Sequence, residues 1–187
     1  MTRIYLSFCG FLLVVLPVVS LAQMEFGRQG VEQDDCYSLP ESLQTIVEAM
    51  DEPGQNVKAL ATRDKRMPLI PMVQRVNVTL LPVGEVSLKE VRSRRMDGSS
   101  GPFAGLLAFM VPRDGVYRIS LGARTWVTVL ESEREVPRVR PMHRLHRCGR
   151  IHKSNEFELK KGSMYWIELS GSDVSTIPLL ISPEEGA

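Results

Sequence analysis

The chain is poor in aromatic residues and in cysteines, and it has no excess of charge of either sign. Only 6% of its 187 residues are aromatic, it contains three cysteines, and its formal net charge is +1. Three cysteines are too few for a scaffold stapled by disulfides, and balanced charge excludes a chain that is all acidic or basic tail. With 43% apolar residues, the composition and length fit about one globular domain.

Sequence motifs of nucleotide-binding and hydrolytic enzymes are also absent. The chain has no Gly-x-Gly-x-x-Gly, no phosphate-binding Gly-x-x-x-x-Gly-Lys and no Gly-x-Ser-x-Gly. Its most basic stretch, residues 134–153, contains no aromatic residue that could stack on a base. The sequence therefore argues against an α/β nucleotide-binding fold and against a nucleic-acid partner.

One long hydrophobic run stands at the start of the sequence. Arg3 precedes an almost uninterrupted apolar stretch over residues 4–19, and Ser20-Leu21-Ala22 supplies the small residues of a signal-peptidase site. We expect residues 1–22 to be a secretory signal, cleaved before Gln23, and the protein to be periplasmic or secreted. The alternative is a membrane anchor, but the run is short for a bilayer span. No other stretch approaches 18 apolar residues, so no membrane span is expected after cleavage.

Two cysteines, Cys36 and Cys148, follow the predicted signal. In an oxidising compartment an even pair usually forms a disulfide. Acidic residues precede Cys36 and arginines flank Cys148, so charge favours their approach. We predict a Cys36–Cys148 disulfide. In the alternative interpretation, Cys148 is a metal ligand or a reactive thiol.

The charges are divided between two segments. Residues 23–55 carry eight acidic side chains and one basic, and residues 134–153, the basic segment, carry seven basic side chains and one acidic. In one interpretation the two segments lie against each other and neutralise each other; in the other, the basic segment binds an anionic partner. The candidate ligand-binding residues are Arg140, His143, Arg144, His146, Arg147, Arg150 and Lys153.

A single helix is predicted over residues 40–50. Ser38 and Glu41 form a capping box, and Pro40 suits the first turn. Apolar residues recur at helical spacing as far as Met50, and Pro53-Gly54 ends the helix. The following residues, 55–71, are charged and show no clear period, so we interpret them as a connection.

Period-two alternation begins after Met72 and indicates about eight short strands separated by Gly, Pro and Asp. The fold class predicted is all-β: an antiparallel β-sandwich, jelly-roll-like, with one N-terminal helix. The chain is divided into a signal (1–22), an N-terminal segment with the helix (23–71) and the sandwich domain (72–187). The turn at Arg113-Asp114-Gly115 is expected to join two neighbouring strands. Four aromatic residues are expected in the core: Phe109, Tyr117, Trp126 and Phe157.

All three histidines, His143, His146 and His152, lie within ten residues of one another. Imidazoles at this density raise the possibility of an iron or zinc site. On an extended strand, however, His143 and His146 would point to opposite faces, and the surrounding cations oppose a divalent ion. No metal or cofactor is therefore favoured; iron or zinc held by His143, His146 and His152 is the alternative.

The second half of the chain resembles a group of small exported proteobacterial proteins. The resemblance rests on Gly115-Val116-Tyr117-Arg118, on Trp126, on the loop 143–148 with the strand 151–159 after it, and on Leu169-Ser170-Gly171-Ser172. It covers about residues 76–181 and implies an exported β-sandwich protein. Some members carry the label homogentisate 1,2-dioxygenase, an activity that requires iron bound by two histidines and a carboxylate.

From the residues we favour an exported cell-envelope protein that binds rather than catalyses. It would present the basic segment to an anionic envelope ligand or to a partner protein. The alternative is a metal-dependent, dioxygenase-like enzyme that uses the histidine cluster, in which case a carboxylate such as Glu156 or Glu158 would complete the site. A purely structural exported domain within a complex is the third possibility.

Overall fold

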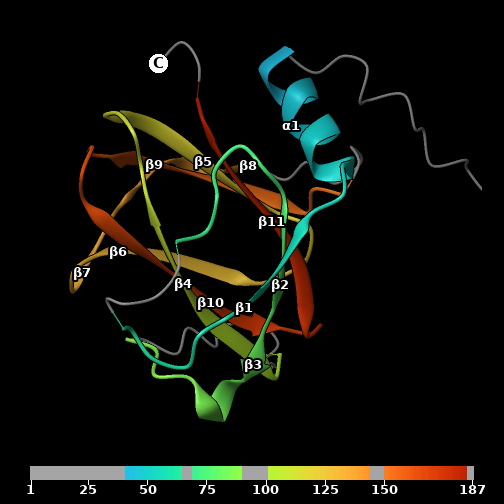
Figure 1. Cartoon of the computed structure of the whole chain (residues 1–187), viewed down its shortest axis with the longest axis vertical. Helices are drawn as coiled ribbons and strands as arrows, with labels where there is room; N and C mark the ends of the chain where they lie inside the picture. The colour runs from blue at the N-terminus through green and yellow to red at the C-terminus, as the bar shows by residue number, and fades with distance from the viewer. Residues whose placement is uncertain (1–40, 65–68, 90–100, 144–149, 185–187) are drawn as a thin grey trace, which may run out of the picture. The chain divides into compact units, whose positions relative to one another are not determined.

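A computed structural model describes residues 41–64, 69–89, 101–143 and 150–184. Their apolar runs form two β-sheets (Figure 1). The six-stranded sheet has the order β1-β2-β11-β5-β9-β8, and the five-stranded sheet the order β3-β4-β10-β6-β7. The six strands are β1 (Gln55–Lys58), β2 (Val76–Thr79), β11 (Thr176–Pro183), β5 (Gly115–Leu121), β9 (Lys153–Leu159) and β8 (Arg138–His143). The five are β3 (Leu81–Pro82), β4 (Phe103–Met110), β10 (Met164–Ser172), β6 (Trp126–Glu131) and β7 (Arg134–Glu135).

The strand order confirms the predicted all-β sandwich. When the edge strands β1 and β8 and the short β3 are left out, eight strands remain, of which β7 is the fifth. The sheets then read β2-β11-β5-β9 and β4-β10-β6-β7. Successive strands thus fall alternately in one sheet and the other at the start, and the last strand returns beside the first. This is the double Greek-key order of a jelly roll.

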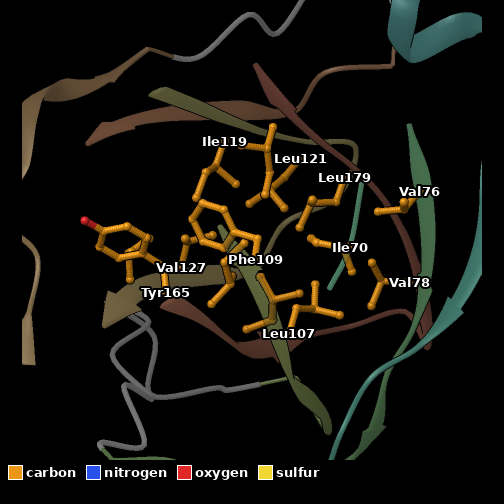
Figure 2. Close-up of a cluster of buried hydrophobic side chains, with 14 of the residues drawn as sticks. Ile70, Val76, Val78, Leu107, Phe109, Ile119, Leu121, Val127, Tyr165 and Leu179 are labelled. Atoms are coloured by element: carbon orange, nitrogen blue, oxygen red, sulfur yellow. The ribbon is translucent and has the colours of Figure 1, made fainter. Parts of the chain in front are cut away.

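The core between the sheets consists of the inward-facing residues of both. Figure 2 shows Ile119 and Leu121 of one sheet packed against Leu107, Phe109 and Val127 of the other. The Phe109 and Tyr165 rings are 5.6 Å apart between centroids and tilted by 35°, an arrangement that aromatic pairs favour. Each buried aliphatic side chain stabilises the fold by about 1.5–3 kcal/mol relative to its exposed state.

The predicted helix is confirmed as α1 (Glu41–Asp51). Ile46 and Met50 pack on Ile151 and Leu180 at the outer face of the six-stranded sheet. Arg75 donates from Nη1 to the carbonyls of Met50 (3.0 Å) and Glu52 (3.1 Å). A guanidinium at this position satisfies carbonyls that the end of a helix leaves unpaired.

The connection predicted over residues 55–71 is in part a strand. β1 pairs in parallel with β2, from Gln55 opposite Val76 to Lys58 opposite Thr79. Ala59 and Ile70 are buried in the main core. A domain boundary between residues 71 and 72 would therefore cut through the six-stranded sheet and its core, and all described residues belong to one compact unit.

Three further sequence interpretations were wrong. The Arg113–Gly115 turn does not form a hairpin, because β4 and β5 belong to different sheets. The period-two pattern after Met72 also predicts a strand at Val86 and Leu88. These residues instead follow a short 3₁₀ helix, η2 (Val83–Glu85), and pack on the outer face of the five-stranded sheet.

Trp126 is the third. It is half-buried at the start of β6, whereas Phe109, Tyr117 and Phe157 are buried as predicted. The buried tryptophan is Trp166, which lies in the outer apolar layer of the five-stranded sheet. The difference follows from position: Trp126 begins its strand at the end of the sandwich, while Trp166 lies within β10 between two neighbouring strands.

Candidate functional site

The basic segment begins as the two edge strands on one side of the sandwich. The chain leaves β7 at the edge of the five-stranded sheet and enters β8 at the edge of the six-stranded sheet. β8 pairs with β9, with Arg140 opposite Glu156 and His143 opposite Ser154. Two register shifts interrupt this pairing, as β-bulges do at sheet edges.

Among the predicted ligand-binding residues, three fall outside the residues that the structure describes: Arg144, His146 and Arg147. Cys36 and Cys148 also lie outside them, so the disulfide stays a prediction. Arg140 and His143 have defined positions in the β8 backbone. The far end of the basic segment is fixed by His152, whose N–H donates to the Leu121 carbonyl over 2.7 Å.

Arg150 is exposed and lies beside the acidic helix. Its Nε is 3.3 Å from Asp51 Oδ1, with 60% and 53% of the two side chains exposed. Next to it, Ile151 packs with Ile46 and Met50 of α1. One point of contact thus joins the acidic segment to the basic segment, as the first interpretation of the charge pattern expects.

Lys153 differs from its predicted role as an exposed cation. It is the first residue of β9, opposite Leu121 of β5, and only 8% of it is exposed. Its Nζ lies 5.5 Å from the centroid of the Trp126 ring, within the range of a cation–π contact. Because Lys153 has the same parity on β9 as the core residue Phe157, its side chain starts toward the interior of the sandwich.

A buried ion-pair cluster that no sequence pattern predicts lies on the outer face of the six-stranded sheet. Arg118 Nη2 is 2.8 Å from Glu156 Oε1 and 2.6 Å from Glu184 Oε2. The three side chains are only 6%, 2% and 12% exposed. Beside them, the hydroxyls of Ser120 and Ser154 share a hydrogen bond of 2.8 Å.

Buried polar atoms without a hydrogen bond in this cluster include Arg118 Nη1 and Ser182 Oγ. Arg118 and Ser182 are direct cross-strand partners on β5 and β11. The six-stranded sheet therefore carries, from β9 to β11, a row of buried polar groups in which Glu156 is also the register partner of Arg140 in the basic segment.

The outer face of the five-stranded sheet buries a different kind of group, a single carboxylate. Glu168 on β10 is 3% exposed, between Leu106 and Thr128 on the neighbouring strands. Its Oε1 accepts the backbone N–H of Lys89 over 2.9 Å. Burial raises the pKa of Glu168 above its usual value, and the effect exceeds the opposing influence of this hydrogen bond and of Arg63 and Lys89.

Within the described ranges, no three His, Cys, Asp or Glu side chains come together as metal ligands. Of the three histidines, only His152 has a described side chain, and it is half-buried.

The helix that the structure describes, α1, has eleven residues, and no helix in the described part is both long and apolar enough to span a membrane.

Comparison with protein-family models gave no match, and a search of curated proteins gave no significant match.

Proposed function

We propose that the protein is an exported cell-envelope binding module whose basic segment binds an anionic ligand. The observation that supports this is the position of β8. It carries the basic segment along an edge of the six-stranded sheet to which, among the described strands, no further strand is added. Ligands and partners reach such an edge without disturbing the core.

The charges along this edge favour an anionic ligand. Arg134 and Arg138 are exposed at the start of the segment, and Arg150 is exposed at its end. Arg138 forms no ion pair with any described residue. Exposed cations attract anions with little desolvation cost. A carboxylated polysaccharide of the envelope and an anionic lipid headgroup share the chemistry that these guanidinium groups recognise.

The rigid frame suits binding. The row Arg118–Glu156 ties β9 to β5, and His152 ties the end of the basic segment to Leu121. A segment that is held at both ends loses less conformational entropy when a ligand binds. The sandwich therefore serves as a scaffold for a preorganised cationic edge.

The test measures binding of purified protein to polygalacturonate and to vesicles that contain phosphatidylglycerol. The double substitution Arg138→Glu and Arg150→Glu should weaken binding about tenfold. The matched control is the double substitution Arg113→Glu and Lys161→Glu, which reverses two exposed cations outside the basic segment. Binding should also weaken as salt is added.

Each probe has a clear consequence. Binding to polygalacturonate alone identifies a polysaccharide ligand, and binding to vesicles alone identifies a lipid surface. Equal loss in both double variants would attribute binding to net charge and contradict a site on the basic segment. The exported form should begin at Gln23, which N-terminal sequencing of periplasmic or secreted protein checks.

A further inference from the structure

Among the described residues, none pairs with the outer edge of β1. It is the outermost strand of the six-stranded sheet and pairs in parallel with β2. Gln55 N donates to the Arg75 carbonyl and Ala59 N to the Thr79 carbonyl, over 3.1 and 2.8 Å. In a parallel ladder the residues between such donors turn their main-chain groups the other way. Asn56 and Lys58 therefore present amide and carbonyl groups at the outer edge of β1.

A groove of about 610 Å³ lies along this edge. Residues 55–60 form one wall and residues 69–71 form the other. The lining includes Val57, Leu60 and Leu69, and its one charged residue is Lys58. Leu69 is 44% exposed. The groove thus combines unpaired main-chain groups, apolar side chains and a single positive charge.

Both walls are fixed to β4 of the other sheet, so the groove exists before any ligand binds. Leu60 and Leu106 exchange two backbone hydrogen bonds of 3.0 and 3.1 Å, and Ile70 N donates to the Ala108 carbonyl over 2.9 Å. Gly105 permits this approach, because a Cβ at that position would lie 2.4 Å from the Ala59 Cβ. A preformed groove binds with a smaller entropy cost than one that must be ordered.

We propose that this groove binds an extended acidic segment of a partner protein, which adds to β1 as a further strand. Strand addition uses main-chain hydrogen bonds for affinity and pockets for alternate side chains for specificity. Here Asn56 and Lys58 supply the main-chain groups, and Leu60 and Leu69 the apolar contacts. The single charge in the lining, Lys58, favours an acidic segment. The site lies outside the basic segment and does not depend on its function.

The second wall of the groove favours an extended segment over a second folded copy of this chain as the occupant. Residues 69–71 stand across the groove from β1. Because they flank the edge of β1, they oppose the approach of another whole sheet edge more than that of a single extended chain. The four residues of β1 offer about 13 Å of edge, enough for about four residues of a bound strand.

The experiment measures binding of the full protein to an acetylated, amidated peptide that alternates glutamate and valine. A second peptide of the same sequence is N-methylated at alternate amides and cannot donate to β1. Lys58→Pro removes a donor at the free edge, a position where a sheet tolerates proline. Lys58→Gln removes the charge but keeps the donor. Leu69→Glu places a charge in the groove, and Val174→Glu, at a side chain that is 47% exposed elsewhere, is its control.

If the proposal is correct, N-methylation of the peptide and Lys58→Pro each weaken binding about tenfold. Lys58→Gln should weaken it about twofold to threefold. Leu69→Glu should abolish binding, and Val174→Glu should not change it.

Saturable binding that is equal for the two peptides would exclude strand addition, and so would the absence of binding at millimolar peptide. The N-methylated peptide keeps the proposal testable with unmodified protein if Lys58→Pro does not fold. Concentration-dependent dimerisation that Leu69→Glu abolishes would instead identify a second copy as the occupant and overturn the proposal. None of these results depends on binding of polygalacturonate or vesicles by the basic segment.

Discussion

The two sheets both bury charge on their outer faces, but only one of them pairs it. On the six-stranded sheet, Glu156 lies against the guanidinium of Arg118 at 2.8 Å. On the five-stranded sheet, Glu168 lies in an apolar layer with a backbone N–H as its direct hydrogen-bond donor. The comparison shows two ways to remove a carboxylate from water, by a partner of opposite charge or by a shift toward its neutral form.

The difference has opposite consequences for substitution. A buried ion pair contributes little net stability over an apolar replacement, but the loss of one partner leaves an uncompensated charge. A carboxylate without a counter-ion lowers the stability of the folded state whenever it is ionised. We therefore expect the protein to lose stability when Arg118 on the six-stranded sheet is truncated. We expect it to gain stability when Glu168 on the five-stranded sheet is replaced by a neutral residue.

The largest effect is expected for Arg118→Met. This change leaves Glu156 and Glu184 buried without their guanidinium, so the free energy of unfolding should fall by about 3–5 kcal/mol. Denaturant unfolding measures it. The control, Arg113→Met, removes an exposed guanidinium and should change stability by less than about 0.5 kcal/mol. Adding Glu156→Gln to Arg118→Met should restore part of the loss; a double variant no more stable than the single one would contradict the pairing.

An intermediate effect of opposite sign is expected for Glu168→Gln. The pKa of Glu168 is raised in the folded protein above its ordinary value of 4.5. The protonated Glu168 side chain therefore contributes fully to the stability of the folded state below pH 4.5. This contribution is lost as the pH rises through the pKa of the folded state. The amide oxygen of glutamine still accepts the Lys89 N–H. At pH 8 the variant should be more stable than the native protein by an amount on the order of 1 kcal/mol.

The pH dependence distinguishes this explanation from a simple packing change. The charged groups around Glu168 are Lys89 and Arg63 on the covering segments and Glu133 on the β6–β7 turn. Unfolding midpoints should converge as pH falls toward 4.5, because both proteins then carry a neutral group. A stability difference that stays constant from pH 8 to pH 4 would refute the role of ionisation.

The smallest effect is expected for Asp51→Asn at the exposed ion pair with Arg150. More than half of each side chain is exposed, so water and salt screen the attraction. The loss should be below about 1 kcal/mol and should vanish at high salt. A loss comparable to that of Arg118→Met would show that the contact between acidic and basic segments matters more than its exposure suggests.

Hydropathy patterns predicted the strands and the helix in which apolar residues recur at the spacing of the buried face. The run 103–111 is apolar on both faces, and the structure shows why: β4 packs on the core through Leu107 and on the outer layer through Leu106. The apolar stripe of the helix that ends at Met50 was also predicted from the sequence, and it is buried. In both cases apolar side chains lie in an apolar environment.

The features that the sequence analysis missed are mainly polar or charged side chains that are buried in the fold. Arg118, Glu156 and Glu168 sit at strand positions where alternation assigns polar residues to solvent, and long-range partners decided their burial instead. β1 holds one aliphatic residue, Val57, and depends on its pairing with β2 rather than on its own period. Lys153 belongs by sequence to a charged loop, but the register of β9 directs it inward.

The place of β11 has a consequence for biosynthesis. This strand, near the end of the chain, lies between β2 and β5 in the middle of the six-stranded sheet. Neither neighbour can complete its hydrogen bonds until residues 176–183 have left the ribosome, because non-local pairing must wait for both partners. Until that segment is available, the six-stranded sheet lacks the strand that joins β2 to β5, so the two parts of this sheet cannot pair.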